Sequence, residues 1–105
     1  MSKNENLTIQ EIFNLAVKNH QEGKIDIAQD FYNQILKIHP NYADAHNNLG
    51  AIFTNLKKYQ KAKECYEKAI KINPNYADAH YNLGLIFKEL GDNQKAKECF
   101  EKVIE

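Results

Sequence analysis

The sequence predicts an all-α fold, a solenoid of stacked helix-turn-helix units with about six antiparallel helices. Three observations predict it. A segment of the chain recurs at a fixed interval, each copy contains two stretches with helical spacing of apolar residues, and glycine or proline separates most of these stretches. An internal period between about 20 and 50 residues is typical of proteins in which each unit packs on its neighbours.

The repeat has a period of 34 residues, the interval from Pro40 to Pro74. The segment Pro-Asn-Tyr-Ala-Asp-Ala-His at 40–46 recurs unchanged at 74–80, and Gln-Lys-Ala-Lys-Glu-Cys at 60–65 recurs at 94–99. A diverged copy precedes both. We therefore divide the chain into a polar leader (1–8), two full units (9–42 and 43–76) and a third unit (77–105) that is incomplete and has no capping helix.

The first unit has recognisable helix boundaries. Thr8 and Glu11 have the spacing of a capping box, which predicts that the first helix begins after Thr8. Gly23 stands where this helix should end, because glycine accepts the left-handed conformation common at that place. The second helix should stop before Pro40, since proline cannot continue a helix.

The second unit shows the helical spacing most clearly. Its first apolar stripe consists of Ala45, Leu49, Ile52, Phe53 and Leu56, and its second of Tyr59, Ala62, Tyr66, Ala69 and Ile70. Lys57 occupies the position of Gly23 and Gly91 in the other units. If Lys57 keeps the left-handed conformation, we expect a local cost of up to about 1 kcal/mol.

The third unit repeats the pattern, with Asp92 placed to cap its second helix. Small residues recur on the first helices, and we expect them to face alanines on the second helices so that the paired helices approach closely. These positions are Ala16, Gly50 and Gly84, facing Ala28, Ala62 and Ala96.

This pattern resembles the tetratricopeptide repeat (TPR) family over about Ile9 to Glu105. The residues that carry the resemblance are Leu49, Gly50, Phe53, Ala62, Tyr66, Ala69 and Pro74, with Leu83, Gly84, Phe87, Ala96, Phe100 and Val103 in the third unit. The resemblance implies a right-handed α-solenoid whose first helices line a concave groove. The family's common tryptophan is replaced by Ile12, His46 and His80.

Composition excludes several classes of partner. The chain has 14 basic residues, all lysines, and 14 acidic residues, so its formal charge is zero. We therefore expect neither nucleic-acid nor membrane binding, because both depend on surplus positive charge. The polar N-terminus and the absence of a long apolar run predict a cytoplasmic protein without disulfides.

The sequence offers no catalytic or metal motif, so we expect no enzyme activity, metal or cofactor. His46 with Cys65 and His80 with Cys99 share one spacing, but like residues lie a whole unit apart. We interpret these as packing residues. On the outer face, lysine and glutamate four residues apart should pair. The expected pairs are Lys63–Glu67, Lys97–Glu101, Glu64–Lys68 and Glu98–Lys102.

The candidate site is the groove. Asparagine recurs at Asn14, Asn48 and Asn82, and a row of amides could donate to and accept from the backbone of an extended peptide. The other candidate groove residues are Asn47, Ala51, Asn55, Tyr81, Leu85 and Lys88. The alternative interpretation is structural, with the asparagines bonding neighbouring helices.

The row is similar to the asparagine ladder of the TPR superhelix in O-linked N-acetylglucosamine transferases. By contrast, Phe13, Asp78 and Asn82 stand where the family's clamp for acidic tails has basic residues, and only Asn48 fits that clamp. The resemblance thus implies a non-catalytic module that binds an extended peptide of a protein partner.

Two other functions stay open. The chain could self-associate into a homo-oligomer through its uncapped end, around Leu85, Ile86 and Val103. It could also be the N-terminal, substrate-positioning part of a larger glycosyltransferase.

Overall fold

A computed structural model describes residues 7–104, which form six helices and no strands. The helices are α1 (Ile9–Gln21), α2 (Ile25–Ile38), α3 (Ala43–Asn55), α4 (Tyr59–Ile72), α5 (Ala77–Glu89) and α6 (Asn93–Val103). The predicted all-α fold is confirmed. The predicted leader lies mostly outside the described residues, as does Glu105. Over the described part of the chain, each helix is too short or too polar to cross a bilayer.

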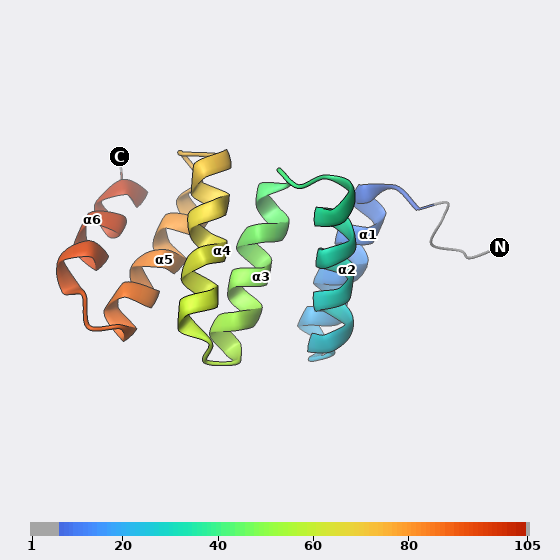
Figure 1. Ribbon diagram of the computed structural model, residues 1–105, viewed down its shortest axis with the longest axis horizontal. Coiled ribbons are helices and arrows are strands. Elements are labelled where there is room, and N and C mark those ends of the chain that lie inside the picture. The colour runs from blue at the N-terminus through green and yellow to red at the C-terminus, as the bar shows by residue number, and fades with distance from the viewer. Residues whose placement is uncertain (1–6, 105) are drawn as a thin grey trace.

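The helices follow one another along a single axis (Figure 1), from α1 and α2 at one end to α5 and α6 at the other. Consecutive helices form pairs, and each pair packs on the next through α2 with α3 and α4 with α5. The molecule measures 52 × 25 × 19 Å, so it is elongated. This is the α-solenoid that the 34-residue period predicts.

Side-chain caps mark the starts of α1 and α6. The Thr8 hydroxyl accepts from the Glu11 amide at 3.1 Å, and the Glu11 carboxylate accepts from the Thr8 amide at 3.0 Å. These hydrogen bonds hold the pKa of Glu11 below its ordinary value. The Asp92 carboxylate accepts from the Lys95 amide at 3.1 Å. Both predicted caps are therefore confirmed.

The core is a row of two clusters. One joins α1 and α2 to α3, and it contains Tyr32, Ile35 and Ile52, none of which has measurable exposure. The other joins α4 to α5 and α6, with Tyr66 and Ile86 among its members. Since each cluster crosses a boundary between units, no helix pair buries its apolar surface alone.

The small residues on the first helices make room for rings. A Cβ atom built on Gly50 would lie 2.5 Å from Cε1 of Tyr66, and one on Gly84 would lie 2.5 Å from Cε1 of Phe100. We expected these glycines to face Ala62 and Ala96, but the atoms nearest to them belong to the aromatic rings. The glycines therefore let each ring lie against the helix backbone.

Three of the four ion pairs expected on the outer face do not form. Lys63 and Glu67 form no ion pair, and neither do Glu64 with Lys68 or Lys97 with Glu101. The Lys63 ammonium instead lies 6.0 Å from the centroid of the Phe87 ring, and the Lys95 ammonium lies 5.5 Å from it. A solvated ion pair gains little, whereas a lysine stem covers apolar surface. The pair Glu98–Lys102 stays a prediction.

Candidate functional site: the groove of the first helices

All nine predicted groove residues lie on α1, α3 or α5, one helix from each unit. They differ in exposure. Asn14, Asn55, Tyr81, Leu85 and Lys88 are exposed, Asn48, Ala51 and Asn82 are half-buried, and Asn47 is buried. Eight of the nine predicted residues are therefore at least partly accessible on the first helices.

Asn47 departs from the expectation, because it is only 6% exposed. Its Oδ1 accepts from Nδ2 of Asn82 at 3.3 Å, and its Nδ2 donates to Oδ1 of Asn48 at 3.5 Å. Asn82 lies on α5, so the amide of Asn47 connects two units. The amide of Asn47 is therefore used inside the stack, where α5 packs beside it, and little of its surface is open to a peptide.

Asn48 and Asn82 belong to the same hydrogen-bonded chain. Nδ2 of Asn48 donates to the Tyr32 hydroxyl on α2 at 3.0 Å. The connection thus runs from Asn82 through Asn47 and Asn48 to Tyr32, and it crosses all three units. Part of the asparagine row therefore holds the helices together, as the structural interpretation required.

These amides keep further hydrogen-bonding capacity, because a primary amide has two N–H donors and two acceptor sites on its oxygen. Asn48 uses one N–H on Tyr32, and Asn82 uses one on Asn47. Asn14 is bonded only within α1, where its Oδ1 accepts from Nε2 of Gln10 at 3.0 Å. At each of the three positions at least one N–H remains for a ligand.

Two further side-chain contacts join α3 to the neighbouring units. The Tyr76 hydroxyl donates to the Asp44 carboxylate, and burial together with this acidic partner raises the pKa of Tyr76. Nδ2 of Asn55 lies 3.3 Å from Nε2 of His20 on α1. Burial lowers the pKa of His20, which favours the neutral ring that can accept this hydrogen bond.

Tyr81 and Leu85 stand at the C-terminal edge of the groove, with 49% and 40% of their surfaces exposed. The Tyr81 ring contacts the Phe100 ring, with 5.8 Å between their centroids. Ile86 was expected in this exposed surface, but it is 1% exposed. It points inward and packs in the cluster shared with α4.

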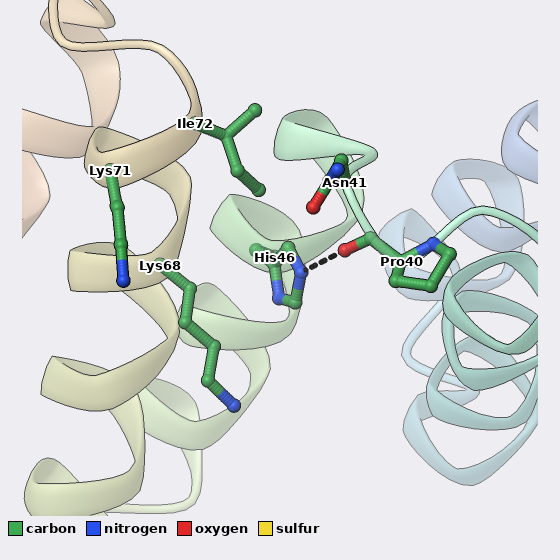
Figure 2. Close-up of a pocket in the computed structure, with 6 residues that line it drawn as sticks. All are labelled: Pro40, Asn41, His46, Lys68, Lys71 and Ile72. Atoms are coloured by element: carbon green, nitrogen blue, oxygen red, sulfur yellow. Dashed lines mark hydrogen bonds between the residues drawn. The ribbon is translucent and has the colours of Figure 1, made fainter.

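A separate hollow of about 590 Å³ lies between the α2–α3 turn and α4 (Figure 2). Its lining residues are Pro40, Asn41, His46, Lys68, Lys71 and Ile72. Nε2 of His46 lies 2.8 Å from the Pro40 carbonyl oxygen, and His80 repeats this contact with Pro74. These two histidines thus tie α3 and α5 to the turn that precedes each of them. The hollow could not be predicted from the sequence, because α4 and the turn meet only in the folded stack.

The described residues hold no group of three or more side chains placed to bind a metal ion. Cys65 and Cys99 are free thiols. Burial raises the pKa of both, so each thiol is a packing group with little thiolate character.

Family comparison agrees with this architecture. Two models described as Tetratricopeptide repeat match residues 43–76 and 65–98, which together span more than half of the chain. The protein ycf37 of Pyropia yezoensis is 37% identical over 59 residues, which are 55% of this chain. The chain covers 33% of the length of ycf37.

Solved structures give the same result. A crystal structure of MamA superposes with a TM-score of 0.86 at 27% identity, covering 92% of this chain and 57% of MamA. The second TPR of Spaghetti (RPAP3), solved with the HSP90 peptide SRMEEVD, superposes with a TM-score of 0.87 at 22% identity. That match covers 96% of this chain and 94% of the other, and at this identity it shows the fold alone.

Proposed function

Because this chain is a member of the tetratricopeptide repeat family, we propose that it is a non-catalytic protein-interaction module that binds an extended peptide in the groove of α1, α3 and α5. The observation that carries the proposal is the repeated amide on the first helices. Asn14, Asn48 and Asn82 recur at the interval of the units and keep unused N–H donors. Such a row contacts a peptide backbone whatever its side chains are.

The charges of the groove indicate which peptides fit. Phe13, Asp78 and Asn82 occupy positions where a clamp for acidic tails needs basic residues, and the chain has no arginine. The Spaghetti domain was solved with an acidic HSP90 peptide. For this chain we expect neutral or basic peptides instead, because Asp44 and Asp78 lie on the groove helices.

The amide row alone gives weak binding. Each hydrogen bond contributes a net of about 0.5–1.5 kcal/mol, whereas association costs about 4–15 kcal/mol. A useful affinity needs an apolar anchor, and the exposed Tyr81 and Leu85 at the edge of the groove can provide it. For the amide row alone we expect dissociation constants from about millimolar to high micromolar, and tighter binding where the anchor is used.

The test starts from random short peptides displayed on phage, selected on the chain and then synthesised. Asn48→Ala combined with Asn82→Ala should weaken binding of a selected peptide by about ten-fold. Methylation of alternate backbone nitrogens in the peptide should weaken it as well, because the ligand is held through its backbone. Isothermal titration calorimetry measures both effects.

Asn48 and Asn82 also connect helices, so the double substitution should lower the stability of the fold as well as the affinity for the peptide. We expect the double variant to lose about 1–3 kcal/mol of unfolding free energy. Tyr32→Phe is the matched control, because it removes the bonding partner of Asn48 and leaves the asparagine in place. If Tyr32→Phe weakens peptide binding as much as the double variant does, or if the double variant binds normally, the proposal is wrong.

A further inference from the structure

We propose that the hollow between the α2–α3 turn and α4 is an anion site, and that its ligand is the phosphate group of a phosphate monoester. We call it the turn hollow. It has a volume of about 590 Å³, and its lining residues are Pro40, Asn41, His46, Lys68, Lys71 and Ile72. None of them belongs to the amide row of the groove, so this site is independent of the peptide binding proposed above.

The turn hollow has positive charge that the chain does not neutralise. Lys68 and Lys71 are three residues apart, so they are neighbours on the surface of α4. Glu64 and Glu67 precede them by one turn, yet neither lysine forms an ion pair within residues 7–104. No acidic side chain is among the described residues that line the hollow. A bound anion would therefore offset the repulsion between two like charges.

The turn supplies polar groups opposite the lysines. Figure 2 shows Asn41 and the His46 ring beside the turn, across the hollow from α4. Nε2 of His46 lies 2.8 Å from the Pro40 carbonyl oxygen, so this nitrogen donates there. Within the described part of the chain, the other ring nitrogen and the Asn41 side-chain amide form no hydrogen bond. Both are therefore available to a ligand.

The hollow recurs one unit later, which indicates that the repeat itself builds it. A second hollow, of about 480 Å³, has the equivalent residues in its lining, namely Pro74, Asn75, His80 and Lys102. Nε2 of His80 again lies 2.8 Å from a carbonyl oxygen, that of Pro74. The residue one period after Lys71 is Glu105, so the repeat does not supply a second lysine there. We expect this second hollow to bind the same anion more weakly.

The position of Lys68 separates an anion site from an ordinary helix end. A helix dipole favours positive charge in the last turn, which explains Lys71 and also Lys37, its equivalent at the end of α2. Lys68 lies before the last turn of α4, so the dipole explains it less well. Lys37 does not line the turn hollow and is therefore a matched control.

Charge and shape favour a phosphate monoester over a carboxylate. A monoester has a charge of about −1.5 to −2 at neutral pH and three acceptor oxygens, which matches two ammonium groups and the amide of Asn41. A carboxylate has one charge, and the chain has no arginine to hold it in a bidentate pair. Pro40 and Ile72 add apolar surface for the carbon next to the phosphate. The monoester is either a phosphorylated side chain of a partner protein or a small phosphate compound.

The test follows backbone amide signals of the whole chain by NMR during titration. The probes are a blocked tripeptide with phosphoserine between two glycines, glycerol 3-phosphate and inorganic phosphate, each compared with sodium chloride at the same ionic strength. We expect the monoesters to shift the Asn41 and His46 signals saturably, with dissociation constants of about a millimolar. Inorganic phosphate should bind at least about three-fold more weakly, because it does not contact the apolar wall. The tighter of the two monoesters identifies the source.

Lys68→Gln should weaken phosphoserine binding by about five-fold or more, because it removes one of the two charges of the hollow. Lys37→Gln changes the net charge equally and should leave the affinity within about two-fold. Both lysines are exposed, so neither variant should alter the circular dichroism spectrum.

The proposal is wrong if the Asn41 and His46 signals do not saturate, or if chloride shifts them as the monoesters do. Equal weakening by Lys68→Gln and Lys37→Gln would show a general charge effect in place of a site. Inorganic phosphate binding as tightly as both monoesters would overturn the assignment to a monoester. Asn48→Ala with Asn82→Ala should leave monoester binding unchanged, so failure of the groove and failure of the turn hollow are separate results.

Discussion

At the scale of single residues, each turn within a helix pair needs one residue in the left-handed conformation. Gly23 and Gly91 have φ angles of 80° and 84°, and Lys57 has a φ angle of 59° at the equivalent position. The conformation predicted from the repeat is confirmed at all three. Lys57 is the only non-glycine residue with positive φ among the described residues. The middle turn therefore carries a strain that the other two avoid.

Lys57→Gly should stabilise the protein. Relief of the left-handed strain exceeds the extra entropy of glycine in the unfolded chain, and we expect a gain of about 0.5–1 kcal/mol in the free energy of unfolding. Urea denaturation measures it. Lys58→Gly is the matched control, because Lys58 is exposed and has a φ angle of −92°. Equal gains from both variants would show that strain at Lys57 is not the cause.

Gly50→Ala tests the contact between helix backbone and ring. The added methyl group would overlap the Tyr66 ring, which is 2% exposed and cannot move outward. Overpacking costs about 1–3 kcal/mol, and the better helix propensity of alanine returns up to about 1 kcal/mol. We expect a net loss of about 1–2 kcal/mol in urea denaturation. Gly84→Ala should cost less, because the half-buried Phe100 ring lies at the open end and can shift.

The tyrosines of the first and second units differ in their hydrogen-bond partners. The first unit has Ala16 where the others have glycine, and its Tyr32 hydroxyl bonds to Asn48 of the next unit. The Tyr66 hydroxyl instead donates to Thr54 of its own unit, since the Thr54 hydroxyl already donates to the Gly50 carbonyl. Residues at the same repeat position thus have different hydrogen-bond partners. The period of the sequence alone does not predict this difference.

At the scale of helices, polar side chains join the units as well as apolar ones. The Tyr76 hydroxyl, in the turn before α5, donates to Asp44 at the start of α3. Asp78 also lies close enough to disfavour a negative charge on Tyr76, and Asn47 contacts the hydroxyl. Ionisation of Tyr76 would place a second negative charge beside Asp44. The contact therefore requires the neutral phenol.

Tyr76→Phe should reduce the loss of stability at high pH. The pKa of Tyr76 in the folded protein lies above its ordinary value of 10.0, so the folded state holds a proton that the unfolded state releases. Its contribution is fully present below about pH 10 and is lost as the pH rises through the folded pKa. We expect Tyr76→Phe to be less stable at neutral pH, by about 0.5–1.5 kcal/mol. The gap between the two proteins should narrow above about pH 10, when both are unfolded with urea across a pH series. A constant gap would contradict the assignment.

The local signals of the sequence predicted the helices, but not the contacts between them. Thr8, Asp92 and Gly23 act on their own helix ends, so spacing along the chain is enough to place them. The burial of Asn47 and the exposure of Tyr81 could not be predicted in this way. They occupy one repeat position, yet Asn47 is buried and Tyr81 is exposed, because a following first helix covers only the former. The preference of Lys63 for the Phe87 ring over Glu67 likewise depends on how two units meet.

At the scale of the whole molecule, stability is distributed along a line. Each helix pair packs on the pair beside it, chiefly through α2 with α3 and α4 with α5, with a smaller contact between α3 and α5. Such proteins behave as a chain of units whose stabilities and interfaces add, and the end units lack one interface. The two ends also differ, since α1 presents Glu11 and Lys18 outward whereas α6 presents Phe100 and Ile104. The end that exposes apolar surface should be the weaker one.

Hydrogen exchange should therefore show a gradient, with α6 opening first and α3 and α4 last. The helix α6 packs chiefly on α5 and has an open apolar face, whereas α3 and α4 are flanked by helices on both sides. We expect amides of α6 to exchange at least about ten-fold faster than those of α4, measured by mass spectrometry on proteolytic fragments. Uniform rates in all six helices would show that the units unfold together, and interface energies would then exceed the differences between units.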